Sequence, residues 1–336
     1  MNSFAFTLKW IKSMNFMNNF SIADLLLRPF FLMWSKTGRA SGWLYEAIEK
    51  YSPLFSEKKH RRTMLGGATF DCSLKDHVQQ KIFFFGVYEP LELNTLLDMV
   101  KPGDVVIDAG ANIGAYCLPI AKHLNGTVEV HAFEPIPDNF QLLSRNYELS
   151  GSPENLHLNQ VALWNKAESL EFSLAVHHKN NIGSFTIGKV ANVSKKVTCQ
   201  TITLDTYSQQ KKLARVDVIK MDIEGAEKFA LEGSLEVIKK FRPKIFIEIN
   251  KTACQQAGYS IDELIAPLLQ LNYRIYKFGK FPAKGDWIKN VQNITQENVI
   301  LFPEDYDLAK IEYDIKKTKR KFLKKQILKN KDGTLK

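Results

Sequence analysis

The chain has 336 residues, of which 45% are hydrophobic and 24% are charged, a balance typical of a folded globular protein and not of a disordered one. Its formal net charge of +10 lies at the two ends, because residues 316–336 carry +9 and residues 1–62 carry +6, which leaves residues 63–315 at −5. A protein that binds a nucleic acid backbone in its main cleft would concentrate Lys and Arg there. The charge distribution therefore argues against nucleic acid in the main cleft.

Cysteine spacing and early hydropathy bear on metal binding and cellular location. The four cysteines are at least 27 residues apart, which excludes a CxxC pair or a zinc-finger spacing and favours free thiols in a reducing compartment. The most apolar early stretch, 22–34, is interrupted by Asp24, Arg28 and Pro29, is too short to span a bilayer, and lacks a signal-peptide cleavage site. We therefore expect a cytoplasmic protein without a metal site.

The first 91 residues read as a mainly helical approach to a larger domain. Loosely spaced apolar residues predict helices in the basic segment 1–62, broken at Pro29, Gly38, Gly42 and Pro53. Residues 63–91 follow as a hairpin over 63–74, with Gly66 and Gly67 at its turn, and a helix over 76–85. A second helix over 91–100 is stopped by Pro102 and Gly103 and opens a domain that we place at 92–303.

Short apolar runs alternate with helical segments through this domain. Such alternation predicts a doubly wound α/β fold, in which helices cover both faces of a mostly parallel sheet. A stretch of about 50 residues around 165–205 is too long for a simple crossover and reads as an antiparallel insertion. Seven runs are predicted as strands of the main sheet: 105–109, 128–133, 156–161, 216–221, 245–249, 273–278 and 299–302.

The strongest local motif is a strand that runs into a glycine turn, Asp108-Ala-Gly110-Ala-Asn112-Ile-Gly114. Glycine lets the backbone approach a ligand, and the start of the following helix offers unpaired N–H groups, so the motif predicts a nucleotide site. A dinucleotide fingerprint that begins at Gly110 would need glycine at 112 and 115, but the chain has Asn112 and Ala115. An acid before a GxNxG turn suits S-adenosylmethionine better, while NAD and a plain tight turn stay open as alternatives.

A second acid completes this nucleotide site. Glu134 ends the next predicted strand, 20 residues after Gly114, where a carboxylate can accept hydrogen bonds from both hydroxyls of a ribose. The pair of acids at two neighbouring strand ends therefore predicts an adenosyl ligand with a free ribose diol.

Together with several further blocks, these motifs resemble the FkbM-type methyltransferases, a family of S-adenosylmethionine-dependent O-methyltransferases. The resemblance covers residues 76–302, and the matching blocks, in chain order, are Gly86-Val-Tyr88-Glu89-Pro90, Lys101-Pro-Gly-Asp104, the glycine turn at 108–114, Ala132-Phe-Glu134-Pro135, Thr203-Leu-Asp205, Lys220-Met-Asp222-Ile-Glu224-Gly225-Ala-Glu227, Arg242-Pro243 and Glu248.

The resemblance implies a Rossmann-like methyltransferase fold whose last strand is antiparallel, and S-adenosylmethionine as cofactor. It places Glu89 and Pro135 beside the cofactor, with Asp108, Gly110, Asn112, Gly114, Glu134 and Asp222. The segment 181–184 resembles a Gly/Ser-rich part of the family near the acceptor, although Phe185 replaces a second serine. Trp164 either flanks the adenine or packs in the core.

Methyl transfer to a hydroxyl needs a group that removes the proton, and three carboxylates are candidates. Asp222 and Glu224 follow the fourth strand, where ligands bind in open α/β sheets. Alternatively, both acids stabilise the first turn of the next helix. Glu248, at the end of the fifth strand, is a third candidate that could also form the floor of the site.

The basic tail, 304–336, and the acceptor complete the sequence-based predictions. Leu308, Ile311, Ile315 and Phe322 fall on one face of a helix that is otherwise rich in Lys and Arg, which is typical of a helix at an anionic membrane surface or of a solvated tail. We expect the acceptor to be a small molecule or a glycan, with a sugar hydroxyl of a cell-surface glycan favoured over a small metabolite. The alternative is a non-catalytic partner that retains the fold to bind glycan or protein.

Overall fold

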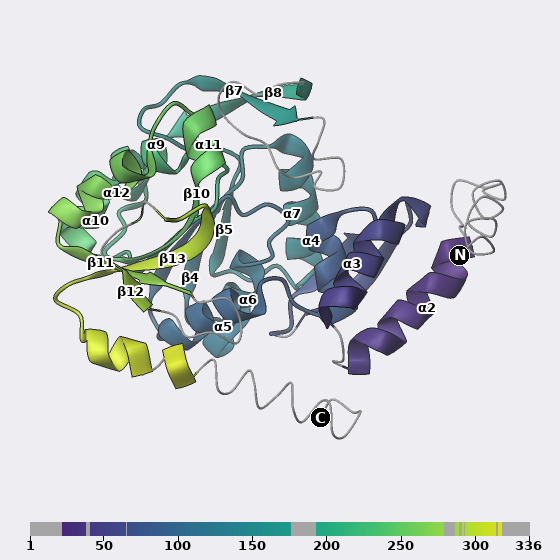
Figure 1. Cartoon of the computed structure of the whole chain (residues 1–336). Coiled ribbons are helices and arrows are strands. Elements are labelled where there is room, and N and C mark those ends of the chain that lie inside the picture. Colours follow the sequence, from purple (N-terminus) through teal and green to yellow (C-terminus); the bar gives the residue numbers. More distant parts are fainter. Residues whose placement is uncertain are drawn as a thin grey trace.

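A central sheet of eight strands, with helices on both faces, organises the chain (Figure 1). The computed structural model describes residues 22–37, 41–64, 66–175, 193–278, 286–288, 291, 293–313 and 315–317. Across the sheet the strands are β12 (Asp286–Ile288), β11 (Tyr273–Lys277), β13 (Gln296–Pro303), β10 (Lys244–Asn250), β9 (Val218–Met221), β3 (Val105–Ala109), β4 (Glu129–Phe133) and β5 (Leu156–Asn159).

The strand directions confirm the doubly wound α/β fold. Strands β5, β4, β3, β9 and β10 are parallel, whereas β13 inserts antiparallel between β10 and β11. This is the Rossmann-like methyltransferase arrangement with its antiparallel last strand. The predicted total of seven strands was too low, because the three-residue strand β12 adds an eighth at the edge, and so short a strand carries no period that a sequence can reveal.

Two apolar cores lie against the two faces of the sheet. One packs β3, β4 and β13 against the N-terminal elements and α6, and the other packs the opposite face against the helices between β8 and β11. The helices are α2 (Ile22–Thr37), α3 (Ser41–Tyr51), α4 (His77–Phe85), α5 (Pro90–Met99), α6 (Cys117–Lys122), α7 (Pro137–Leu149), α8 (Leu204–Lys211), α9 (Glu227–Glu232), α10 (Leu235–Phe241), α11 (Lys251–Gln256) and α12 (Ile261–Gln270), with short 3-10 turns η1 (Ser52–Leu54) and η2 (His123–Gly126).

Local caps set the ends of the helix that precedes the site. Asp76 accepts a hydrogen bond from the backbone N–H of Gln79 at the start of α4. Gly86 ends the helix in the left-handed conformation, with φ of 75°. The predicted helices over 76–85 and 91–100 therefore match α4 and α5 to within one residue.

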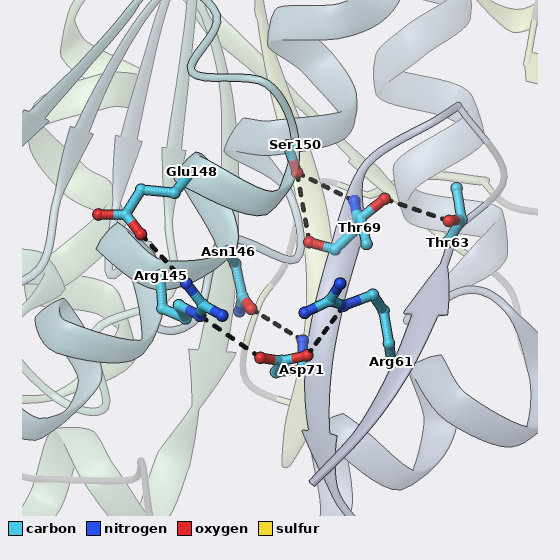
Figure 2. A network of polar contacts seen from close by, with 8 residues as sticks. All are labelled: Arg61, Thr63, Thr69, Asp71, Arg145, Asn146, Glu148 and Ser150. Atoms are coloured by element: carbon cyan, nitrogen blue, oxygen red, sulfur yellow. Dashed lines mark hydrogen bonds and ion pairs between the residues drawn. The ribbon is translucent and has the colours of Figure 1, made fainter.

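A hairpin of β1 (Lys59–Thr63) and β2 (Thr69–Ser73) is fastened to α7 by polar contacts (Figure 2). The side-chain oxygen of Asn146 accepts from the N–H of Asp71 at 3.0 Å, and the hydroxyl of Ser150 accepts from the N–H of Thr69 at 2.9 Å. Because these side chains occupy the outer edge of β2, they satisfy backbone groups that would otherwise pair with another strand. The hairpin begins four residues before the predicted Thr63.

A second, three-stranded sheet follows β5. It consists of β6 (Ala162–Leu163), β8 (Val193–Ile202) and β7 (Ser169–Ala175). Strands β7 and β8 are antiparallel as predicted, but the prediction of a wholly antiparallel insertion was wrong, because β6 pairs with β8 in parallel. The middle of the predicted insertion, residues 176–192, lies outside the described residues.

The two ends of the described chain carry apolar side chains with different surroundings. On α2 and α3, Leu25, Leu26, Phe30, Met33 and Trp43 are between 48% and 78% exposed. In contrast, Leu308 and Ile311 pack against the core, and Ile315 is buried. The apolar face predicted for the tail is thus covered by the protein's own core up to residue 315, while Phe322 and most of the basic residues lie outside the described part. Within the described residues, no helix is both long and apolar enough to cross a bilayer.

Candidate functional site

A cavity of about 320 Å³ opens at the carboxyl ends of β3, β4 and β9. The strand order reverses there, because β4 lies on one side of β3 and β9 on the other, and this is where open α/β sheets bind ligands. Helix α4 and the loop before α5 line one wall, and Ala162, Leu163 and Phe172 of the small sheet line another. The predicted residues Glu89, Asp108, Gly110, Asn112, Glu134, Pro135, Asp222, Glu224 and Glu248 all line this cavity.

The glycine turn after β3 is held against the ends of two neighbouring strands. The N–H groups of Gly110 and Ala111 both donate to the carbonyl of Phe133, at 2.9 and 3.0 Å. A Cβ on Gly110, whose φ is 79°, would come within 2.1 Å of the carbonyl oxygen of Asp222, and only glycine therefore fits. Gly114 does not line the cavity but lies against Leu118 and Leu143, where a Cβ would come within 2.5 Å of Leu118.

Glu134 ties the second strand to this turn. Its Oε2 accepts from the N–H of Asn112 at 2.8 Å and its Oε1 from the N–H of Ile136 at 2.9 Å. Burial raises the pKa of Glu134 to about 7, although these N–H groups favour its charged form. Oε1 also accepts from Asn139 Nδ2 at 3.4 Å, so Oε2 is the oxygen that retains a lone pair for a ligand hydroxyl.

A buried cation joins the acids at the ends of β3 and β9. The Nζ of Lys220 lies 3.5 Å from Asp108 Oδ1 and 3.6 Å from Asp222 Oδ2, and 4.6 Å from the ring centre of Tyr116. Burial would lower the pKa of Lys220, but the carboxylates of Asp108 and Asp222 outweigh it and raise that pKa. Both oxygens of Asp108 are buried and, among the described residues, accept no hydrogen bond. The ammonium group is therefore fixed in its charged form beneath the cavity.

Asp222, Glu224 and Glu248 converge, as the sequence predicted. One carboxylate oxygen from each lies within 4.8 Å of the other two. Glu248 Oε1 accepts from Gln296 Nε2 at 2.9 Å, and burial together with the charges of Asp222 and Glu224 raises the pKa of Glu248 to about 8. Glu224 has a left-handed backbone with φ of 52°, a conformation that is unfavourable for a non-glycine residue and is frequent at functional sites.

The structure assigns the stabilisation of the next turn to a different acid. Glu227 accepts from the N–H of Ile223 at 3.0 Å and from the N–H of Gly225 at 2.9 Å, and the hydroxyl of Tyr259 approaches it at 3.3 Å. The residue before α9 is Ala226, which has no capping side chain. Glu227 thus satisfies N–H groups of the turn before α9, while Asp222 and Glu224 both line the cavity.

The loop before α5 reaches the glycine turn through one hydrogen bond. The hydroxyl of Tyr116 donates to Glu89 Oε2 at 2.7 Å, and the ring of Tyr88 meets that of Tyr116 edge-on. Glu89 has a left-handed backbone with φ of 40°, and burial and the charge of Asp222 raise its pKa. Residues 88 and 89 thus lie in the cavity wall.

Other predictions met a different outcome. Trp164 does not line the cavity but packs on Phe229, with ring centres 4.2 Å apart, which supports the core interpretation. The segment 181–184 lies outside the described residues. Sequence analysis assigned no role to Lys220, although it quoted the residue within a motif, and it missed His77 and Lys81, because α4 joins the cavity only through tertiary packing.

Two groups of side chains in the described part have a spacing that fits a metal ion. One is the carboxylate cluster of Asp222, Glu224 and Glu248, and the other is Glu129, His131 and His157, on β4 and β5. The Nε2 of His131 lies 3.1 Å from Glu129 Oε1, and its Nδ1 lies 2.8 Å from the hydroxyl of Tyr207. This proximity neither supports nor contradicts the expectation of no metal, which stays a prediction.

The residues around the cavity fit S-adenosylmethionine. Glu134 offers acceptors for the ribose hydroxyls, the glycine turn leaves room for close approach, and the acids at the strand ends match a ligand that carries a sulfonium and an ammonium charge. The same cavity lacks the third glycine that a dinucleotide pyrophosphate would use, as Ala115 shows.

Comparisons with known proteins agree with this geometry. The chain is 26% identical over 153 residues to the hexuronic acid methyltransferase AglP of Haloferax volcanii, a match that covers 44% of this chain and 56% of the relative. It is 24% identical over 163 residues to the 31-O-demethyl-FK506 methyltransferase FkbM of Streptomyces tacrolimicus, covering 40% and 60%. The chain thus spans somewhat more than half the length of these relatives.

A solved structure and a family model are also similar to the chain. A crystal structure of methyltransferase FkbM from Methylobacillus flagellatus is similar at 18% identity and a TM-score of 0.40, over 68% of this chain and 52% of that one. The family described as the methyltransferase FkbM domain matches residues 108–275, which is half of the chain and contains the glycine turn, Glu134 and the three converging carboxylates. The chain therefore belongs to the FkbM methyltransferase family, whose methyl donor is S-adenosylmethionine.

Proposed function

We propose that this protein transfers a methyl group to a hydroxyl of a sugar. The observation that carries the proposal is the convergence of Asp222, Glu224 and Glu248 at the ends of two parallel strands, beside the candidate cofactor site. Such a cluster can both accept hydrogen bonds from a sugar diol and remove a proton from one of its hydroxyls.

The chemistry assigned to the chain's own residues is proton removal and orientation. Bound S-adenosylmethionine supplies a methyl group on a sulfonium, which leaves as a neutral thioether. Glu248 accepts the proton of the acceptor hydroxyl, since a general base works best when its pKa is near the working pH, and burial with neighbouring charges raises its pKa to about 8. Asp222 and Glu224 orient the hydroxyl in line with the methyl group, and Lys220 holds Asp222 in place.

A sugar acceptor is favoured over a small apolar metabolite by the polarity of the cavity. Six carboxylates line it, and a hydroxyl-rich ligand satisfies such acceptors better than an apolar one. The printed name of the relative AglP, a hexuronic acid methyltransferase, points to the same class of acceptor, whereas that of the FK506 methyltransferase points to a secondary metabolite.

The test is a methyl-transfer assay with radiolabelled S-adenosylmethionine across extracted surface glycans and small metabolites. We expect label in a sugar methyl ether, and loss of S-adenosylhomocysteine binding in Glu134→Ala, because two charged hydrogen bonds contribute roughly 3 kcal/mol. Glu129→Ala, an acid on the same strand outside the cavity, is the matched control. Bound cofactor without turnover on any acceptor would instead favour a non-catalytic glycan- or protein-binding role.

We further propose that the enzyme acts at an anionic membrane surface. Leu25, Leu26, Phe30 and Met33 on α2 and Trp43 on α3 are exposed. Helix α2 lies at the outer edge of the molecule (Figure 1). These exposed apolar side chains lie within the basic segment 1–62, a combination that suits insertion into a charged lipid interface. The basic residues 316–336 add to the attraction.

Vesicle binding tests this location. Full-length protein is expected to sediment with anionic vesicles and not with neutral ones, and high salt should weaken the binding. Leu26→Glu should reduce binding, whereas Leu269→Glu, an equally charged change at an exposed leucine of α12, should not. Equal binding by both variants would show that Leu26 on α2 does not contact the membrane.

A further inference from the structure

Few basic side chains line the cavity, and most of them already contact other side chains of the protein. Three basic side chains line the cavity: His77, Lys81 and Lys220. Lys220 is held between Asp108 and Asp222. His77 contacts the hydroxyl of Tyr45, and burial and the charge of Lys81 lower the pKa of His77 to about 4, so that it is neutral at physiological pH. Among the described residues, Lys81 is therefore the cation left to face a ligand.

Lys81 sits between two aromatic rings. Its Nζ lies 5.0 Å from the ring centre of Tyr45 on α3 and 5.1 Å from that of Tyr88 in the loop before α5. Within the described part of the chain, no carboxylate lies within ion-pair distance of this ammonium group, although Glu89, Glu49 and Glu92 act on it from farther away. Burial lowers the pKa of Lys81 against these charges, so the site holds a cation that its surroundings compensate only in part.

We propose that Lys81, framed by Tyr45 and Tyr88, binds a carboxylate group in this cavity. The carboxylate belongs either to the methionine part of S-adenosylmethionine or to an acidic sugar, and the proposal rests on the proposed function for both sources. The remaining wall repels anions, because its other charged side chains are the carboxylates of Glu89, Asp108, Glu134, Asp222, Glu224 and Glu248, apart from the engaged Lys220.

The contacts around Lys81 favour the cofactor as the source. Tyr88 meets Tyr116 edge-on, and Tyr116 donates to Glu89 just after the glycine turn. This chain of contacts links Lys81 to the turn that would hold the cofactor. A carboxylate at Lys81 and an ammonium group near the acids would together orient the methionine part.

Calorimetry with two ligands tests the proposal. S-Adenosylhomocysteine and its decarboxylated analogue differ only in the carboxylate, and each is titrated into the full-length protein, Lys81→Met and Lys50→Met. We expect Lys81→Met to weaken S-adenosylhomocysteine about 10- to 100-fold and to leave the analogue nearly unchanged. Lys50 is the matched control, because it also lies over a tyrosine ring, at 5.8 Å from Tyr51, but is exposed outside the cavity.

The other outcomes show whether the carboxylate bound by Lys81 belongs to the cofactor or to an acidic sugar. If Lys81→Met leaves both affinities unchanged, methyl β-glucuronide and methyl β-glucoside are titrated into the S-adenosylhomocysteine complex, and selective loss of glucuronide binding assigns the site to the acceptor. Equal weakening of both cofactor analogues, or no selective loss with either pair, overturns the proposal. Lys81→Arg keeps the positive charge and should retain binding. Retained binding in Lys81→Arg would show that the loss in Lys81→Met comes from the missing charge and not from a folding defect. If the unchanged protein does not bind S-adenosylhomocysteine, the proposed function itself fails.

Discussion

The two ends of strands β3 and β9 carry the same set of charges and use them differently. At the amino ends, Arg215 lies between Asp104 and Asp217, and at the carboxyl ends Lys220 lies between Asp108 and Asp222. The Arg215 side chain is 51% exposed, whereas that of Lys220 is 8% exposed.

The backbone makes the difference between these two clusters. At the amino end, Asp104 Oδ2 accepts from the N–H of Lys101 and Asp217 Oδ2 from the N–H of Val105, both at 2.9 Å, so the carboxylates are satisfied. At the carboxyl end, Asp108 accepts no hydrogen bond among the described residues. Acids that accept backbone hydrogen bonds beside an exposed cation stabilise the fold, whereas a buried acid without such hydrogen bonds, beside a buried cation, is suited to a ligand site.

Removal of the acid at the carboxyl end should produce the largest change. Asp222→Asn is expected to lower kcat/KM for methyl transfer about 10²-fold, because the acceptor hydroxyl that Asp222 orients loses its alignment with the methyl group, with little change in thermal stability. Asp217→Asn, the counterpart at the amino end, should lower thermal stability and leave kcat/KM nearly intact. Similar losses of kcat/KM in both variants would remove the distinction between the two ends.

The two cations should differ in their contribution to stability. Lys220→Met leaves the buried Asp108 without its counter-charge, and the free energy of unfolding should fall by about 3–5 kcal/mol. Arg215→Met removes a half-exposed cation from two acids that keep their backbone hydrogen bonds, and should cost only about 0–1 kcal/mol. Urea denaturation measures both. A small loss in Lys220→Met would show that water already reaches the inner pair.

The acids at the carboxyl ends of the parallel strands could be predicted from the sequence, because the apolar runs of the strands lead directly into recognisable motifs. Apolar runs identified β3, β4, β9 and β10, and the resemblance named Asp108, Glu134, Asp222 and Glu248 at their ends. Residue type does not distinguish Asp104 from Asp108. Which of the two accepts hydrogen bonds from backbone N–H groups depends on loops that come together only in the folded protein. The glycine turn that follows Asp108 supplied that distinction.

Side chains that reach the site through tertiary packing escaped prediction. Lys81 and His77 lie on α4, about 30 residues before the glycine turn, and no local pattern ties them to the cavity. Glu227 was hidden among neighbouring acids, since only the fold shows which of three carboxylates turns back to the backbone. The tail's apolar face packs against the core up to Ile315, which the sequence could not reveal because amphipathicity fits a core as well as a lipid surface.

The pH dependence of stability should come from the carboxyl-end cluster. The pKa of Glu248 rises from an ordinary value near 4.5 to about 8 in the folded protein, so the folded state binds this proton more tightly. The resulting stabilisation is present below about pH 4.5 and is lost as the pH rises through 8, with a slope of at most about 1.4 kcal/mol per pH unit for one group.

Urea denaturation between pH 5 and 8.5 measures that slope. Glu248→Gln should flatten it and make the variant more stable than the unchanged protein at pH 8.5. Part of the slope should persist, because burial raises the pKa of both Glu134 and Glu227 to about 7. Glu304→Gln, at an exposed acid paired with Arg274, should leave the slope unchanged. A slope that survives intact in Glu248→Gln would place the titrating proton elsewhere.

The smallest effect concerns backbone strain on either side of β9. Lys212 ends α8 with φ of 53°, and Glu224 follows β9 with φ of 52°. Glycine adopts this conformation without the steric cost of a Cβ, so Lys212→Gly should stabilise the fold by up to about 1 kcal/mol and leave kcat/KM unchanged. Glu224→Gly should relieve the same strain but lower kcat/KM, because it also removes a carboxylate from the cavity.

Thermal unfolding and turnover, measured on both variants, compare the two ends directly: strain at Lys212 serves only the chain reversal, whereas strain at Glu224 keeps a carboxylate in place. Full activity in Glu224→Gly would show that the carboxylate is dispensable and would restrict the catalytic cluster to Asp222 and Glu248.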